Sequence, residues 1–431
     1  MNSLWSRTAD IAERKALDTD CRTDVLIVGG GIAGILCAYK MECAGIPYIL
    51  AEAETVCSGI TRNTTAKITC QHGLICSRLI KEYGVEKARM YFEANREALK
   101  EYRLLCKNIN CDFEEKDSYV YSTGDRKAIE KEVKSIEELG FTANFTKETS
   151  LPFDIAGAVR FPNQAQFNPL KFISSISEGL NIYEYTKICE FQGNKVVTNQ
   201  GTIRAKKIII ATHFPIINKH GGYFLKQYQH RSYVIAFENA QQINGMYVDE
   251  RKTGMSFRNY RDLLLIGGGG HRTGKQGGKW QEISDFASRF YPNAKERFRW
   301  AAQDCMTLDG IPYIGLYSRG TPDMYVATGF NKWGMTSAMA AASILTDMIK
   351  GKQNDYADLF SPARSMLHPQ LFINAAEAAV NLLTPTAKRC PHLGCALKWN
   401  SQEHSWDWPC HGSRFDEDGA LIDNPATDNL S

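Results

Sequence analysis

Short apolar runs and helical spacings alternate along the first fifty residues. Residues 25–28 (VLIV) form an apolar run of the length expected for a buried parallel strand. Small and apolar residues then recur at helical spacing to about residue 44, where Gly45 is a typical helix stop. Residues 48–51 form a second apolar run. The pattern predicts a strand–helix–strand unit of a parallel sheet.

Glycines occupy the turn between the first expected strand and its helix, at the spacing G-x-G-x-x-G. In such a unit the first glycine allows a tight turn, the second lets the backbone approach a pyrophosphate, and the third lets helix and strand pack closely. The helix N-terminus offers N–H groups to phosphate. An acidic residue at the end of the second strand can accept hydrogen bonds from the ribose hydroxyls. We therefore expect a dinucleotide site at Gly29, Gly31, Ile32, Ala33, Gly34 and Glu52.

Further along, helical and strand-like patterns are mixed. Apolar residues at three- and four-residue steps indicate helices at 78–106 and 126–140. Residues 155–240 alternate as in strands and include a buried strand at 208–211, and another strand-like block covers 228–270. These patterns predict a mixed α/β protein.

Two later segments also place glycines after an apolar run, as the first one does. In residues 263–274 (LLLIGGGGHRTG), Arg272 stands at the third glycine position, so we interpret this segment as a strand running into a glycine turn. Residues 324–351 repeat strand, loop and helix, with the helix starting near Thr336 and stopping at Gly351. We expect no second nucleotide site.

Composition and charge narrow the class of protein. The 431 residues favour two or three domains, and a formal net charge of +3 gives no reason to expect a nucleic acid or an acidic membrane as a partner. No apolar run reaches the roughly 18 residues that a membrane-spanning helix needs, and the first twenty residues lack a signal-peptide core. Most of the 13 cysteines are scattered singly, as in reduced proteins. We predict a cytoplasmic protein.

Across about residues 20–352 the chain resembles the D-amino-acid-oxidase/glycine-oxidase class of FAD-dependent oxidoreductases. The resemblance rests on the glycine fingerprint with Glu52, the Thr-rich loop before Lys67, the IIIAT strand at 208–212 and the late GFNKWGMT helix start. The chain departs from the family at His213, where glycine is usual.

The resemblance implies FAD bound in an extended form, with its adenine end at Glu52. The helix start at residues 334–336 would face the flavin pyrimidine edge. A mixed β-sheet substrate domain, roughly residues 91–160 and 221–300, would cover the flavin. Further cofactor-binding residues implied by the resemblance are Thr64, Thr65, Ala66, Ala211, Gly329, Trp333, Gly334, Met335 and Thr336.

Family chemistry is hydride removal from a C–N bond of an amine or amino acid, and a substrate carboxylate would need an Arg or Lys partner. Lys67 lies in the loop nearest the expected flavin, while Arg231 and Tyr233 lie on a strand expected over its face. We predict catalytic roles for these three. The other candidates, each with a structural alternative, are His72, His230, Arg258 and His271.

After a linker at 353–385, residues 386–431 resemble the cluster-binding part of a Rieske iron–sulfur domain, without its supporting β-sandwich. Such domains hold a [2Fe-2S] centre with two Cys and two His. The resemblance assigns ligand positions to Cys390, His392 and His411, but the fourth position is Trp408. It also matches Cys395 and Cys410 to a pair that often forms a disulfide.

Three interpretations of this segment stay open, because Trp cannot donate a lone pair to iron. Cys410 could supply the missing thiolate of a [2Fe-2S] centre. The segment could be vestigial, with a Cys395–Cys410 disulfide. Cys390, His392, Cys395 and one of Cys410 and His411 could hold zinc.

The sequence therefore predicts an α/β protein with an FAD-binding Rossmann-like domain, a mixed β-sheet substrate domain and a small C-terminal Rieske-like β segment. We expect an FAD-dependent amine or amino-acid dehydrogenase or oxidase. Its electrons would pass to a C-terminal [2Fe-2S] centre, an electron-acceptor protein, a soluble carrier or dioxygen. The alternative is a non-catalytic or redox-sensing flavoprotein with a structural C-terminal flap.

Overall fold

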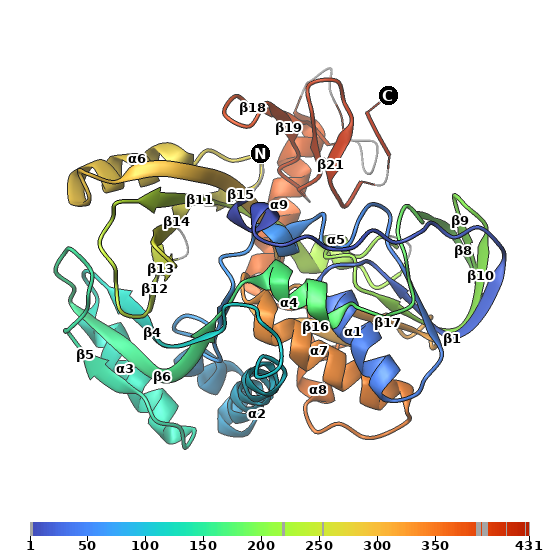
Figure 1. Cartoon of the computed structure of the whole chain (residues 1–431), viewed down its shortest axis with the longest axis horizontal. Helices are drawn as coiled ribbons and strands as arrows, with labels where there is room; N and C mark the ends of the chain where they lie inside the picture. The colour runs from blue at the N-terminus through green and yellow to red at the C-terminus, as the bar shows by residue number, and fades with distance from the viewer. Residues whose placement is uncertain are drawn as a thin grey trace.

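The computed structural model describes residues 3–217, 220–251, 254–384, 389, 395–410, 412–426 and 428–430. Over these ranges, two large β-sheets lie side by side with helices packed around them, and a small C-terminal sheet sits on top (Figure 1). This arrangement confirms the predicted α/β class.

The first sheet contains the predicted strand–helix–strand unit. Its strands are β1 (Cys21–Val28), β2 (Tyr48–Ala51), β7 (Ile182–Tyr183), β8 (Ile188–Gln192), β9 (Lys195–Thr198), β10 (Thr202–Ile210), β16 (Tyr313–Leu316) and β17 (Met324–Thr328). The order is β16-β17-β10-β1-β2-β7, and β9 and β8 extend from β10. Val28 lies level with Ile210 and Ala51 in parallel ladders, so the carboxyl ends of three strands meet at one edge. Ligands of open parallel sheets bind at such an edge.

The second sheet stands beside the first and is mixed. Its strands are β3 (Lys67–Ile68), β4 (Glu114–Ser122), β5 (Asn144–Thr146), β6 (Gly157–Gln166), β11 (Gln227–Glu238), β12 (Met246–Asp249), β13 (Ser256–Tyr260), β14 (Leu263–Arg272) and β15 (Lys295–Thr307). β4 and β12 pair in parallel, whereas β11 pairs antiparallel with both β14 and β15. These long β11 ladders bring residues of distant sequence segments to one surface.

The helices cover both sheets and agree only partly with the sequence patterns. They are α1 (Ile32–Cys43), α2 (Cys76–Leu105), α3 (Arg126–Glu138), α4 (Pro169–Ile176), α5 (Tyr223–Lys226), α6 (Lys279–Phe290), α7 (Gly334–Ile349), α8 (Ala357–Phe360) and α9 (Pro369–Leu383), with short 3-10 turns η1 (Leu4–Arg7) and η2 (Ile60–Asn63). The helices predicted at 78–106 and 126–140 are confirmed as α2, which is kinked at Gly84 with a φ of +82°, and α3. The strand-like interpretation of 155–240 is wrong at α4, which starts at Pro169 and is capped by the Asn168 side chain.

The glycine turn predicted after the strand at 263 is also wrong. β14 continues through its four glycines to Arg272. Gly269 has a φ of +59°, and a Cβ on it would lie 2.0 Å from the Lys279 carbonyl oxygen. Glycine is needed there because the start of α6 crosses directly over the strand.

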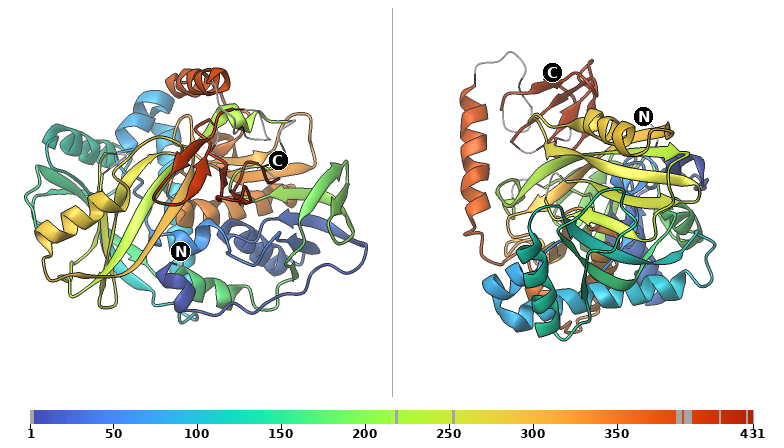
Figure 2. Two further views of the ribbon diagram at one scale, coloured as in Figure 1. Left: turned by 90° about the horizontal axis from the view of Figure 1, so that it is seen from above. Right: turned by 90° about the vertical axis from the view of Figure 1, so that its left-hand side faces the viewer.

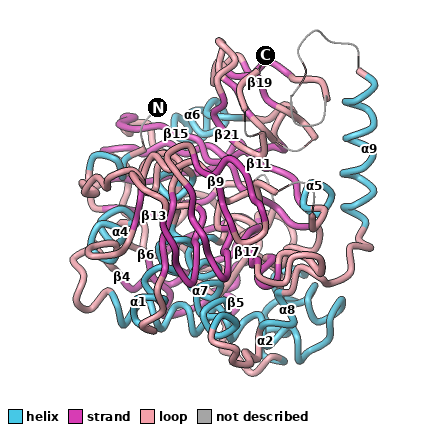
Figure 3. Tube along the Cα trace, turned by 90° about the vertical axis from the view of Figure 1, so that its right-hand side faces the viewer, coloured by secondary structure: helices cyan, strands magenta, loops and turns pink. Residues whose placement is uncertain are grey.

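The C-terminal segment rests on the second sheet beyond α9, which lies along the outside of the molecule (Figures 2 and 3). Its antiparallel strands are β18 (Lys398–Asn400), β19 (Ser405–Asp407), β20 (Arg414–Phe415) and β21 (Leu421–Asp423). Gly412, with a φ of +92°, has room for no side chain, since a Cβ would lie 2.1 Å from Gln229 of β11. The small sheet therefore packs directly on the strand that borders the site.

Within the described ranges, every helix is too short or too polar to span a membrane.

Candidate active site

A cavity of about 1440 Å³ lies where the two large sheets and the C-terminal segment meet. Its lining includes the β1 and β2 ends of the first sheet, β11 and β15 of the second, and Leu421–Asn424 of the C-terminal segment. Typical small-molecule pockets measure about 300–1,000 Å³. The cavity is therefore large enough for a dinucleotide together with a substrate.

The glycine fingerprint forms a tight cradle at one end of the cavity. Gly29 has a φ of +107°, and a Cβ on it would lie 2.7 Å from the Ala211 carbonyl oxygen. A Cβ on Gly34 would lie 1.9 Å from the Gly29 carbonyl oxygen. Gly31 directly precedes α1, and Ile32 is its first residue. The backbone alone can therefore approach a phosphate at this helix N-terminus.

Glu52 lies beside this cradle at the end of β2. Its carboxylate accepts a hydrogen bond of 2.5 Å from the Gly30 N–H and one of 2.9 Å from the Glu54 N–H. Burial raises the pKa of Glu52, although these donors oppose the shift. Glu52, Gly29, Gly31, Ile32, Ala33 and Ala211 all line the cavity.

The Thr-rich loop follows, and Arg258 holds its backbone. The Arg258 guanidinium donates to the carbonyl oxygens of Thr65 and Ala66 at 2.8 and 2.9 Å. Thr64 and Thr65 line the cavity, whereas Ala66 is fully buried behind it. Arg258 is a candidate for substrate contact from the sequence, but its guanidinium binds the backbone of this loop.

Lys67 is a buried lysine on the cavity wall. Its Nζ lies 3.3 Å from the Thr65 hydroxyl. Burial, with a smaller contribution from the charge of Arg258, lowers the pKa of Lys67 to about 7. An amine with this pKa can hold or release a proton near neutral pH.

The Thr-rich loop is joined to the start of α7 through His72. The His72 Nε2 atom lies 3.0 Å from the Thr336 hydroxyl, and Nδ1 lies 2.7 Å from the Tyr91 hydroxyl. The ring stacks on Trp333 at 4.9 Å between centroids. Burial lowers the pKa of His72 to about 3, so the imidazole is neutral. Of the α7 residues expected near FAD, Gly334 and Met335 line the cavity, as do Gly329 and Trp333.

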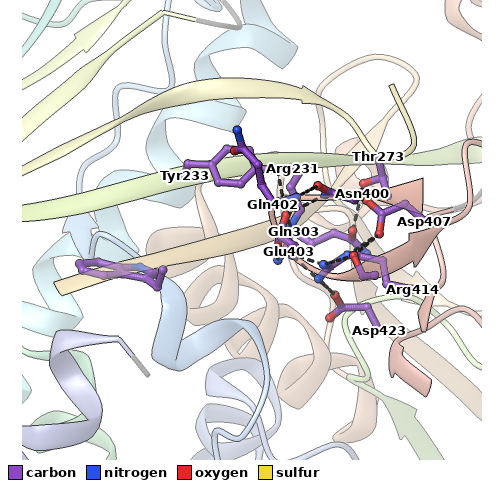
Figure 4. A network of polar contacts seen from close by, with 12 residues as sticks. Arg231, Tyr233, Thr273, Gln303, Asn400, Gln402, Glu403, Asp407, Arg414 and Asp423 are labelled. Atoms are coloured by element: carbon purple, nitrogen blue, oxygen red, sulfur yellow. Dashed lines mark hydrogen bonds and ion pairs between the residues drawn. The ribbon is translucent and has the colours of Figure 1, made fainter. Parts of the chain in front are cut away.

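Arg231 and Tyr233 of β11 line the cavity as well, but both bind Glu403 of the C-terminal segment (Figure 4). The Arg231 Nε–H donates to Glu403 Oε1 at 2.9 Å, and its Nη2 binds Oε2. The Tyr233 hydroxyl donates to Oε1 at 2.8 Å. Burial alone would raise the pKa of Glu403, but Arg231 and Arg414 bring it to about 2.

Sequence reasoning missed this network, which also includes Asp407 and Asp423 bound to Arg414. Glu403 lies in the polar stretch SQEHS, which predicts an exposed turn. No local signal identifies its partner, because Arg231 lies 172 residues earlier in the chain.

The predicted metal ligands Cys390, His392 and His411 lie outside the described residues. Cys395 and Cys410 are free cysteines, not a disulfide, and their thiols are hydrogen-bonded. Burial raises the pKa of Cys410, and Cys395 raises it further. Trp408 is fully buried in the apolar core of the segment, beside Phe415. No group of three His, Cys, Asp or Glu residues suited to a metal occurs in the part of the chain that is described.

Comparison with known families agrees with this architecture. Residues 24–348 match the family model described as DAO, FAD dependent oxidoreductase, and residues 372–431 match the Rieske [2Fe-2S] domain. Fold and glycine cradle together define a flavin-dependent oxidoreductase with a Rieske domain at its C-terminus. The chain belongs to the FAD-dependent oxidoreductase family.

Individual relatives cover most of the chain. YhfW of Bacillus subtilis (strain 168), named as a Rieske 2Fe-2S iron-sulfur protein, is 32% identical over 98% of this chain and 96% of its own length. L-proline dehydrogenase from P. horikoshii has a TM-score of 0.68 at 18% identity, covering 81% of this chain and 98% of that one. Glycine oxidase from Geobacillus kaustophilus has a TM-score of 0.64 at 18% identity, covering 80% and 99%. At this identity, the two structures share the fold.

The residues fit the two implied cofactors unequally. FAD fits the cradle, because a side chain on Gly29 or Gly34 would collide with backbone and Glu52 stands beside them. An ordinary four-ligand Rieske set does not fit, because Trp408 takes the fourth position and packs in the apolar core.

Proposed function

We propose that the chain is an FAD-dependent dehydrogenase or oxidase that acts on a C–N bond of an amine or amino acid. The observation that carries the proposal is one continuous cavity. It has the glycine cradle and Glu52 at one end, and Lys67 with the polar face of β11 elsewhere on its wall. When bound, FAD supplies the hydride acceptor.

Lys67 is assigned the proton transfer. An amine must lose its ammonium proton before a hydride can leave the adjacent carbon, and Lys67 Nζ, with a pKa of about 7, can accept that proton. Arg231 and Tyr233 are assigned a different role from the one their positions suggest in the sequence, because Glu403 already binds both. They hold the C-terminal segment over the cavity.

Reoxidation of FAD is assigned to an electron-acceptor protein, a soluble carrier or dioxygen. We place the enzyme in the cytoplasm, in keeping with the free cysteines of the described residues.

The proposal is tested by anaerobic reduction. The purified protein is assayed for FAD per chain and then mixed with a panel of amines and amino acids while the visible flavin band is followed. Bleaching by at least one compound is expected, and Lys67→Met should slow it without changing the FAD content.

The second candidate is a non-catalytic or redox-sensing flavoprotein. It is favoured by the C-terminal segment, which lines the cavity with Leu421, Asp423 and Asn424 and so covers a bound cofactor. Flavin that dithionite bleaches but no amine or amino acid reduces would establish this candidate and contradict the first.

A further inference from the structure

Helix α9 packs against the rest of the chain through its polar side chains. The Asn374 side chain accepts a hydrogen bond of 2.9 Å from Arg272 Nη1, and the Glu377 carboxylate binds Lys275 at 2.7 Å. Asn374 and Asn381 are the buried residues of the helix. A surface helix ordinarily buries an apolar stripe and exposes its polar residues. In α9 the two faces are exchanged.

The opposite face of α9 is apolar and lies on the outside of the molecule (Figures 2 and 3). Among the described residues, eleven large apolar side chains are exposed, and six of these lie within residues 367–383. Monomeric proteins rarely expose a contiguous apolar patch larger than a few hundred Å², and larger patches mark interaction sites. The six side chains are between 52% and 80% exposed and belong to Leu367, Phe372, Ile373, Val380, Leu382 and Leu383.

Four residues of this face form a stripe along the helix, at steps of four, three and four residues. Phe372 and Leu383 stand at the ends of the stripe, and the exposed Ala376 and Ala379 stand in its middle. Residues at these steps share one side of an α-helix. Alanines at a contact let two helix axes approach to about 8 Å, the short end of the usual range. The stripe is therefore shaped to receive another helix along its length.

The stripe is also complementary to itself. Consider two copies of α9 that run antiparallel about a two-fold axis between residues 377 and 378. Phe372 of one copy then lies opposite Leu383 of the other, and Ala376 lies opposite Ala379. A two-fold interface uses the same patch on both subunits, so that each contact occurs twice. The order of side chains along α9 meets this condition.

Charge and area both favour a second copy of the chain as the partner. Glu377 is the only charged residue between 369 and 383, and it binds Lys275 on the inner side, so the stripe can face itself without like-charge repulsion. Helices that bind membrane surfaces combine an apolar face with Lys or Arg, which α9 lacks. A stable interface buries about 800 Å² on each partner. The six exposed side chains, at on the order of 100 Å² each, supply most of this area.

We infer that α9 forms the centre of a two-fold symmetric dimer interface, in which its exposed stripe packs antiparallel against the stripe of a second copy of this chain. The inference is independent of the proposed function, because none of the four stripe residues lines the cavity. In the dimer the apolar face is buried, while the polar contacts of Asn374 and Glu377 hold each α9 on its own chain.

The test is sedimentation equilibrium of the full-length holoprotein. The mass should rise from the 48.4 kDa of one chain to twice that value between about 1 and 100 µM, because interfaces of standard size give dissociation constants of micromolar or below. The mass of one chain at every concentration would overturn the inference. Pelleting of that monomer with vesicles of phosphatidylcholine and phosphatidylglycerol would then assign the face to a membrane.

Two charge variants test the antiparallel register. Ala376→Glu and Ala379→Lys each place an unpaired charge at the centre of the interface, and both introduce good helix formers. Each variant alone should raise the dissociation constant by about tenfold or more. In a 1:1 mixture the introduced carboxylate of one chain faces the introduced ammonium of the other, so the mixture should recover about tenfold in affinity. A mixture no tighter than either variant would overturn the antiparallel pairing.

Leu104→Glu is the matched control, because Leu104 is 62% exposed near the end of α2 and not on α9. It should leave the dissociation constant unchanged, whereas Leu383→Glu should raise it about tenfold or more. FAD content and far-UV circular dichroism should match the wild type in every variant, which separates loss of the dimer from loss of the fold. A dimer that survives Ala376→Glu, or that Leu104→Glu weakens equally, would overturn the inference.

Discussion

At the Glu52 end of the cavity the wall is shaped by tightly packed backbone, whereas at the Arg231 end it is formed by charged side chains from two distant parts of the chain. The first end depends on glycines within one strand–helix–strand unit, from Gly29 to Glu52. The second depends on Glu403 reaching β11 across 172 residues of sequence. The packed backbone has no room for an added atom, whereas each charged side chain can be replaced, with effects that are not additive because the side chains share one network.

The largest effect is expected from Gly34→Val at the backbone end. Even its Cβ would lie 1.9 Å from the Gly29 carbonyl oxygen, which cannot move without distorting the turn. We expect complete loss of FAD and destabilisation of about 3 kcal/mol or more. FAD per chain and thermal melting measure it. The control is Gly124→Ala, since a Cβ there meets nothing within 4 Å and the residue lies outside the cavity lining; FAD retained by Gly34→Val would refute the cradle.

The next effect concerns the core of the C-terminal segment. Replacing the fully buried Trp408 by Ser should destabilise the segment by about 3–5 kcal/mol. Trp408→Cys has a similar volume loss but restores a thiolate at the fourth ligand position. After anaerobic purification, Trp408→Cys should contain more iron than Trp408→Ser and give a reduced-cluster EPR signal. Equal iron in the two variants would show that the segment does not hold a cluster through this position.

Acid should selectively weaken the contacts that Glu403 makes with Arg231 and Arg414. The pKa of Glu403 is about 2 in the fold, below its ordinary value of 4.5, so its contribution is complete above about pH 4.5 and is lost as the pH falls towards 2. The pKa difference corresponds to about 3 kcal/mol. Thermal melting should show Glu403→Gln to be less stable than wild type at pH 6, with the gap narrowing below about pH 4.5 and closing only towards pH 2. A constant gap across this range would contradict the pKa assignment, and exposed Glu417→Gln serves as control.

The smallest effect is expected at Lys67. At saturating substrate, flavin reduction should slow about tenfold per unit as the pH falls below about 7, because protonated Lys67 cannot accept the ammonium proton. Lys67→Met should be slower at pH 8 and should lose this acid limb. Stopped-flow absorbance measures the rate. An unchanged acid limb in the variant would assign it to another group.

The sequence predicts what is local and misses what is not. The unit from Val25 to Glu52 is predictable because its glycines, helix and strands are set by neighbouring residues. The four glycines of β14 were interpreted as a turn, since nothing in the sequence shows that α6 crosses at Gly269. α4 is not predicted because its eight residues are too few to give a clear helical period within a segment whose other residues alternate as in strands.

At the site, residue types were predicted better than their partners. Lys67 and Arg231 do line the cavity, as the sequence suggests, yet their chemistry follows from burial and pairing. The pKa of Lys67 depends on how deeply the loop packs. The partner of Arg231 depends on how the C-terminal segment lies on β11. Both are tertiary properties without a sequence pattern.

The close fit of Gly412 against Gln229 has a consequence for exchanging the C-terminal segment with one from another protein. With no space for a side chain at this contact, the segment and β11 share one surface, and residues 421–424 form part of the cavity wall. A C-terminal module exchanged from another protein would bring a different wall and a different set of charges to the cavity. Transplanting the module would therefore alter which molecules can enter the cavity.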